Sequence, residues 1–152
     1  MKIFSTPFGN VDKFFFNISG NVGPSCPNKP EDVQLVQFAY FAMAQNKLPE
    51  IPADLMAAAG AVVPGAPYSG APNDPLTIAI RADERARGGT QDGHISVVRG
   101  NLQTYSGANF YLLVRLVNHI RKLLGKDFPR IDKHPKCPPQ LASSVRQTFE
   151  VE

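Results

Sequence analysis

Cys26 and His94 are the residues of this sequence whose chemistry could serve nucleophilic catalysis. Cys26 lies just before a predicted helix, and the dipole at a helix N-terminus lowers the pKa of a nearby thiol. His94 begins the apolar run in "DGHISVV", where an imidazole could act as a general base. A thiol activated by such a base attacks amide carbonyl groups, so these two are the candidate catalytic residues.

Two local features count against this pair. The stretch "CPNKP" places prolines between Cys26 and the helix, and Asn28 is the predicted N-cap, so the thiol lies outside the first helical turn. After His94, only Asn101 and Asn109 remain to orient the imidazole. The pair is therefore the alternative hypothesis: a cysteine amidase or peptidase that resembles cell-wall-directed toxins and acts on peptidoglycan peptides.

The other histidines and cysteine predict no metal site and no cofactor. His134 and Cys137 have a spacing that suits two zinc ligands, but no further pair of ligands lies nearby. His119 follows Arg115 by four residues on a predicted helix and is interpreted as a solvated side chain. Cys26 and Cys137 are predicted to be free thiols, because a cytosolic origin disfavours a disulfide.

The charge of the chain is mild but uneven. Its formal net charge is +3 and its pI is about 9.0, which is too little to indicate nucleic-acid binding. The segment 115–136 carries seven Lys or Arg residues against two Asp residues, with neither aromatic interleaving nor a nucleic-acid motif. A solvated face and a protein contact are the two interpretations of this basic surface, and Arg115, Lys122 and Lys126 are the residues expected to contact a protein partner.

Proline content and hydrophobic periodicity predict the elements that hold these residues. Nine of the 14 prolines lie between Pro24 and Pro75, which indicates long, stiff connections there. Helices are expected at 28–46, 74–88 and 106–125, with short ones at 52–63 and in the tail, a hairpin or extended pair at 2–4 and 14–18, and a turn and short strand at 92–98. The predicted fold is mainly α: a three-helix core, a small β hairpin or extended N-terminal segment, and long Pro/Gly-rich loops.

The first predicted helix is expected to be central. Apolar residues occupy two of its faces: Val33, Val36, Phe41 and Ala44 on one, and Leu35, Phe38 and Ala42 on the other. Such a helix needs cover from two sides. Gln34 and Gln37 mark its remaining side, and hydrogen bonds to loop backbone are the favoured interpretation of both. Only the first half of the helix at 74–88 carries a clear apolar face, so only that half is expected to be buried.

The stretch 22–37, "VGPSCPNKPEDVQLVQ", combines a valine-glycine segment with Asn-x-Pro-x-Asp-Val and Val-Gln, at Val22, Gly23, Asn28, Pro30, Asp32, Val33, Val36 and Gln37. This pattern resembles the first helix of peptidoglycan-binding-like helical domains, found in bacterial cell-wall hydrolases and in phage lysis or injection-system proteins. Degenerate matches follow at Thr77, Ala79, Ile80, Asp92 and Gly93, so the resemblance covers residues 22–100. Where that family has an aromatic residue and a glutamine, this chain has Asp83 and Glu84.

The resemblance implies a non-enzymatic bacterial or phage module that binds cell-wall glycan or a protein partner. Glycan would bind in the groove between helices 28–46 and 74–88, with Gln34, Gln37, Arg81 and Asp92 near its rim. A protein partner would bind the basic side of helix 106–125. The first residues do not have the form of a signal peptide, so delivery outside the cell would need a phage particle or a secretion system.

The length of 152 residues suits one domain. We expect it to span 1–152, with an extended segment at 1–22, a helical core at 22–125 and a tail at 126–152. No window of the sequence has the length and apolarity of a membrane span, so the expected location is the cytoplasm as synthesised.

Overall fold

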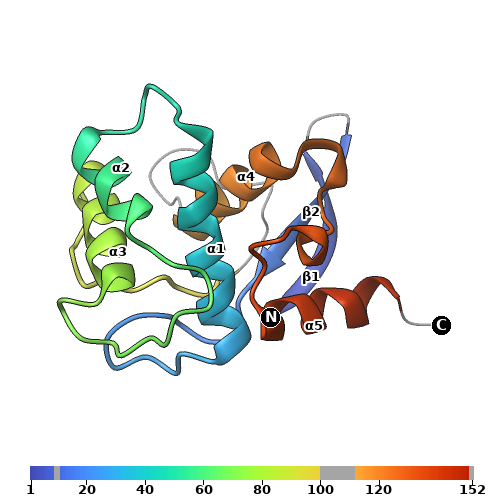
Figure 1. Cartoon of the computed structure of the whole chain (residues 1–152), viewed down its shortest axis with the longest axis horizontal. Coiled ribbons are helices and arrows are strands. Elements are labelled where there is room, and N and C mark those ends of the chain that lie inside the picture. The colour runs from blue at the N-terminus through green and yellow to red at the C-terminus, as the bar shows by residue number, and fades with distance from the viewer. Residues whose placement is uncertain (9–10, 100–111, 151–152) are drawn as a thin grey trace.

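Figure 1 shows the structure of this protein, a computed structural model that describes residues 1–8, 11–99 and 112–150. Within these residues, the elements in chain order are β1 (Lys2–Phe8), β2 (Val11–Asn17), α1 (Pro30–Asn46), α2 (Ala53–Gly60), α3 (Pro75–Ala86), α4 (Leu112–Leu124), the 3-10 turns η2 (Gly125–Asp127) and η3 (Ile131–Lys133), and α5 (Pro139–Phe149). The protein is mainly helical with a small antiparallel hairpin, which confirms the predicted fold class.

Helix α1 lies at the centre of the fold, as its two apolar faces predicted. Eleven of its 17 residues are buried, and α2, α4 and α5 all pack against it. In Figure 1, α2 and α3 lie on one side of α1, while the hairpin and α5 lie on the other. The buried polar side chains of this helix must find hydrogen-bond partners inside the protein, because water does not reach them.

The start of α1 differs from the prediction. Lys29, not Asn28, occupies the N-cap position, and no side chain caps the helix. Asn28 has a φ of 51°, and its side chain bonds to both the N–H and the carbonyl of Gly23. The predicted capping role of Asn28 was therefore wrong, because its side chain closes the loop that precedes the helix.

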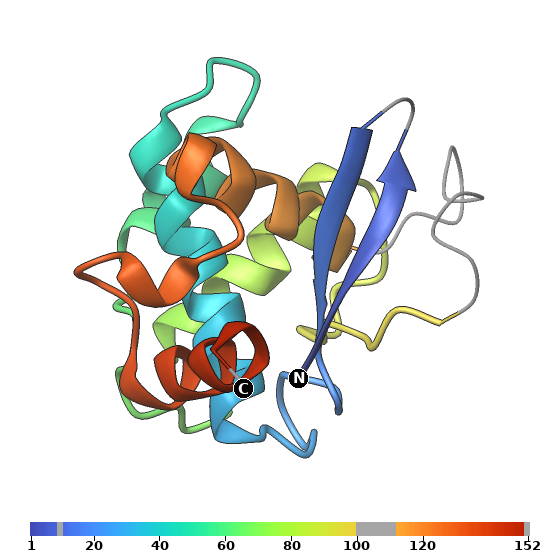
Figure 2. The same cartoon turned by 90° about the vertical axis from the view of Figure 1, so that its right-hand side faces the viewer.

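The aromatic N-terminal segment packs onto the helical core, as predicted (Figure 2). Phe15 and Phe16 of β2 are 2% and 0% exposed. The Phe14 ring meets the edge of Phe149 in α5, with ring centroids 5.5 Å apart. The Arg121 guanidinium of α4 donates to the Phe14 carbonyl at 3.1 Å. Contacts with both C-terminal helices thus cover the phenylalanines that a free hairpin would expose.

The predicted cap of α3 is confirmed, and the strand predicted after it is shorter than expected. Asp74 accepts a hydrogen bond from the N–H of Leu76 at 2.9 Å, which satisfies one of the free donors of the first turn. Gly93 adopts a φ of 77°, in keeping with the predicted Asp-Gly turn. The strand that follows is reduced to a single bridge between Ile95 and Val22.

Part of the second half of α3 is buried, contrary to the prediction, whereas Arg85 and Ala86 at its end are exposed. Asp83 and Glu84 are 1% and 8% exposed. Asp83 accepts from the Tyr40 hydroxyl of α1 at 3.0 Å, and Glu84 accepts from the N–H of Gly93 at 2.8 Å. The prediction rested on the face formed by Leu76, Ala79 and Ile80, which Asp83 shares. The structure also buries Glu84, because its carboxyl group has a hydrogen-bond partner inside the protein.

Helix α4 is described from Leu112, so residues 106–111 of the predicted helix lie outside the described residues. Leu113, Val117 and Ile120 are almost fully buried, and Gly125 follows the helix with a φ of 56°, as predicted. The predicted tail helix is present as α5. No helix within the described ranges is long and apolar enough to cross a membrane.

We expect Leu113→Ala to lower the free energy of unfolding by about 2–5 kcal/mol, because the side chain is fully buried and its truncation leaves a cavity. Ile78→Ala is a matched control, since Ile78 is 46% exposed and its truncation should change the free energy by less than about 0.5 kcal/mol. Urea unfolding of the two variants measures both values. Equal losses would contradict the assignment of the core face of α4.

Candidate functional site

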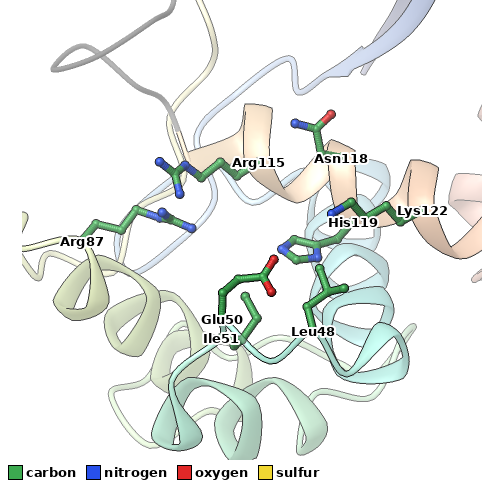
Figure 3. A pocket seen from close by; sticks show the side chains of 8 residues that line it. All are labelled: Leu48, Glu50, Ile51, Arg87, Arg115, Asn118, His119 and Lys122. Carbon is green, nitrogen blue, oxygen red and sulfur yellow. The ribbon is translucent and has the colours of Figure 1, made fainter.

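A polar cavity of about 290 Å³ lies between the connection after α1, the C-terminal end of α3 and one face of α4 (Figure 3). The lining residues are Leu48, Glu50, Ile51, Arg87, Arg115, Asn118, His119 and Lys122. Two residues predicted to bind a protein partner, Arg115 and Lys122, therefore line the same cavity. The third, Lys126, is exposed in η2 and does not line it.

His119 is the buried polar residue of this cavity. The interpretation of His119 as a solvated side chain was wrong, because the residue is only 7% exposed. Its Nδ1 atom has no hydrogen-bond partner within the described residues. Burial lowers the pKa of His119 to about 4, and the nearby charges of Lys122 and Arg87 act in the same direction. The imidazole is therefore neutral near pH 7 and presents an unpaired nitrogen.

Arg87 is held beside the cavity by a buried network. Its Nε atom lies 3.3 Å from Oδ1 of Asp83, one helical turn earlier, and the Arg87 side chain is 26% exposed. The other carboxyl oxygen of Asp83 accepts from the Tyr40 hydroxyl. Burial raises the pKa of Asp83, while Arg87 and Tyr40 act to lower it. A core tyrosine thus fixes the carboxyl group that positions a cavity arginine.

Charge favours an anionic ligand in the cavity. Three cationic side chains, those of Arg87, Arg115 and Lys122, line it together with the carboxylate of Glu50. In Figure 3, Arg87 and Arg115 come from different helices and extend toward each other, and Glu50 approaches the ring of His119. Cationic side chains that line a recess raise the local concentration of anions.

Gln34 and Gln37 of α1 form hydrogen bonds that attach other segments of the chain to this helix. Gln37 donates to the carbonyl of Ala66 at 2.9 Å and accepts from the N–H of Gly65 at 3.0 Å. Gln34 accepts from the N–H of Leu141 at 2.9 Å, and its amide also bonds to a glutamine side chain of α5. Gln37 therefore bonds to loop backbone as interpreted, whereas Gln34 holds α5. Both amides are used within the fold.

The other two predicted glycan-binding residues lie in a different region. Arg81 and Asp92 are near the turn at Gly93, where an added Cβ atom would lie 3.3 Å from Nε of Arg81. Asp92 accepts from the N–H of His94 at 2.9 Å. Beside this turn, burial raises the pKa of Glu84 to about 7, helped by Asp92. The four predicted residues thus contact three separate segments of the chain.

The candidate pair Cys26 and His94 lies near this turn, but the ring nitrogens of His94 face other groups. The Nε2 atom lies 2.9 Å from the carbonyl oxygen of Pro24, and Nδ1 lies 3.7 Å from Oδ2 of Asp92. Burial and the charge of Asp92 raise the pKa of the Cys26 thiol, the direction opposite to activation. Because α1 begins at Pro30, the helix dipole does not reach this thiol.

His134 and Cys137 take part in packing. The His134 ring meets Phe38 and Phe41 edge-on, with ring centroids 5.3 and 5.7 Å apart. Burial raises the pKa of Cys137 to about 12, and both Cys137 and Cys26 are free thiols. Within the part of the chain that the structure describes, no group of three or more His, Cys, Asp or Glu side chains could hold a metal ion.

Sequence reasoning missed Glu50, Arg87 and the apolar wall of the cavity. The spacing of Arg115, His119 and Lys122 places all three on one face of a helix, so this part of the cavity was visible in the sequence. Glu50 and Arg87 come from a connection and from a helix end, and only the tertiary fold brings them to that face. No local pattern could have identified them.

Comparisons of this chain with protein-family models, with curated proteins and with solved structures find no match. The resemblance of residues 22–100 to peptidoglycan-binding-like domains therefore stays a prediction.

We expect Gln37→Leu to lower the free energy of unfolding by about 1–3 kcal/mol, because it leaves the N–H of Gly65 without its partner. Gln45→Leu, an exposed position on the same helix, is the matched control. Urea unfolding measures the free energy of unfolding of both variants. Limited proteolysis of the 61–74 loop shows whether the loop has detached from α1. If the two variants behave alike, Gln37 does not hold the loop.

A second prediction concerns pH. The pKa of Glu84 is about 7 in the folded protein, whereas in the unfolded chain its pKa is near the ordinary value of 4.5. The folded state binds the extra proton between these values, so this group makes stability fall as pH rises from about 4.5 to 7.

Glu84→Gln stays neutral and keeps an acceptor for Gly93, so its stability should decline less than that of the wild type over this range. Melting temperatures of both proteins at pH 5 and pH 8 provide the test. His119 has the opposite effect between pH 4 and 6.5, but it is common to both proteins. Identical pH dependence would show that Glu84 is ionised in the fold.

Proposed function

We propose that this protein is a non-enzymatic binding module that holds a partner protein on the face formed by α4 and the end of α3. The observation that carries the proposal is the convergence of Arg87, Arg115 and Lys122 on one cavity that is also lined by the buried residue His119. Cationic side chains around a recess attract an acidic group and fix its position.

The other functions considered from the sequence receive less support. Cell-wall glycan needs exposed polar side chains, and the amides of Gln34 and Gln37 are already bonded within the fold. An amidase needs an activated thiol, and the pKa of Cys26 is raised. Binding of a protein through the basic side of α4 is the function that the geometry favours.

The test is comparative capture from bacterial lysate with immobilised protein. The double variant Arg115→Glu/Lys122→Glu reverses two charges of the cavity. Lys133→Glu/Lys136→Glu is the matched control, because it makes the same change of net charge at two exposed positions outside the cavity. Melting temperatures of both variants check that they fold.

We expect at least one protein to bind the wild type and the control and to be lost from the cavity variant. A parallel arm with purified wall sacculi measures glycan binding in moderate salt, which weakens nonspecific attraction to anionic polymers. Capture that is equal for both double variants would contradict the proposal. Retention on sacculi that depends on Gln34 or Arg81 would favour glycan instead.

A further inference from the structure

We propose that the cavity beside α4 is a receptor for the C-terminal residue of a partner chain, with its free carboxylate clasped by Arg87 and Arg115. This inference rests on the proposed function, because it names the group by which the partner is held. A C-terminal residue carries a carboxylate, an amide N–H and a side chain on one carbon atom. The cavity offers a complement to each of these three groups.

The carboxylate is matched by the arginines. Both line the cavity, and in Figure 3 they come from different helices and extend toward each other. Arg87 is already oriented by its ion pair with Asp83 at 3.3 Å. Guanidinium groups bind carboxylates through paired, charge-assisted hydrogen bonds, which gives direction as well as affinity.

The amide N–H is matched by His119. The residue lines the cavity and is 7% exposed. Its Nδ1 atom is buried and has no hydrogen-bond partner among the described residues. A buried polar atom in this condition costs free energy unless a ligand satisfies it. A neutral imidazole can accept an N–H at one nitrogen, and burial keeps this ring neutral at ordinary pH by lowering its pKa to about 4.

The side chain is matched by an apolar wall. Leu48 and Ile51 line the cavity opposite the arginines, as Figure 3 shows. The volume of about 290 Å³ lies just below the range of about 300–1,000 Å³ found for ligand pockets, which suits one residue and not a large ligand. An internal Asp or Glu would bring its carboxylate at the end of its own side chain and would leave this wall without an apolar group.

The carboxylate of Glu50 selects against more highly charged anions. It lines the same cavity as the three cations, so a phosphate group would gain from the arginines but would be repelled by Glu50. A monoanion carries less negative charge, so it suffers less from this repulsion. The charge pattern therefore favours a terminal carboxylate over inorganic phosphate.

The test is a titration with two short peptides, acetyl-Ala-Leu with a free carboxylate and the same peptide with a C-terminal carboxamide. We expect the carboxamide to bind at least about tenfold more weakly, measured by calorimetry or by NMR shifts of the His119 ring. Acetyl-leucine and inorganic phosphate are further arms. Acetyl-leucine should bind nearly as well as the dipeptide, because the cavity holds one residue, and phosphate should bind more weakly.

Three variants locate the site. Arg115→Gln and His119→Leu should each weaken binding of the carboxylate peptide, and Lys126→Gln, outside the cavity, should not. Equal affinity for carboxylate and carboxamide, or tighter binding of phosphate, would overturn the inference. So would unchanged binding by both cavity variants, provided that their melting temperatures show a folded protein.

The two proposals fail in different ways. If capture from lysate depends on Arg115 and Lys122 but no peptide binds, a partner is held by some group other than a terminal carboxylate, and only this inference is wrong. If the peptides bind but capture is the same for both double variants, the cavity is a small-ligand site and the proposed function is wrong.

Discussion

The burial of residues 32–40 of α1 on all sides is the constraint on which the rest of the structure depends. A helical segment without a solvent face must place its polar side chains against other parts of the protein. Asp32 accepts from the N–H groups of Ser19 and Gly20, Gln34 and Gln37 hold α5 and the 65–66 loop, and Tyr40 bonds to Asp83. Each of these four buried residues therefore holds a segment that is distant in the sequence, and two of them hold irregular connections in place.

The same constraint explains the location of the candidate site. Buried polar residues that are hydrogen-bonded within the protein are not available to a ligand. Gln34 and Gln37 are both buried in this way, so they do not belong to a binding surface. The polar face of α4, with Arg115, Asn118 and Lys122, lies beside a recess that the end of α3 and the connection after α1 form. His119 is the exception on that face, because it is buried and yet one ring nitrogen is unpaired.

Sequence patterns correctly predicted the features of the fold that depend on interactions between residues close together in the chain. Asp74 before Pro75, the apolar repeat of α4 and Gly125 after it are signals that act within a few residues, and all three hold in the structure. Asn28 failed because an asparagine with positive φ and an asparagine N-cap look the same in a sequence. The burial of Asp83 and His119 depends on Tyr40 and on the α1–α2 connection, and no local pattern carries that information.

The contact between Asp83 and Arg87 has a consequence for the entropy of recognition. A long arginine side chain in solvent samples many rotamers, and a ligand that fixes it loses part of its binding free energy. Arg87 cannot leave its position without removing the cation from a carboxyl group that is 1% exposed. Its rotamer is therefore chosen when the chain folds, and a ligand meets a guanidinium that is already ordered.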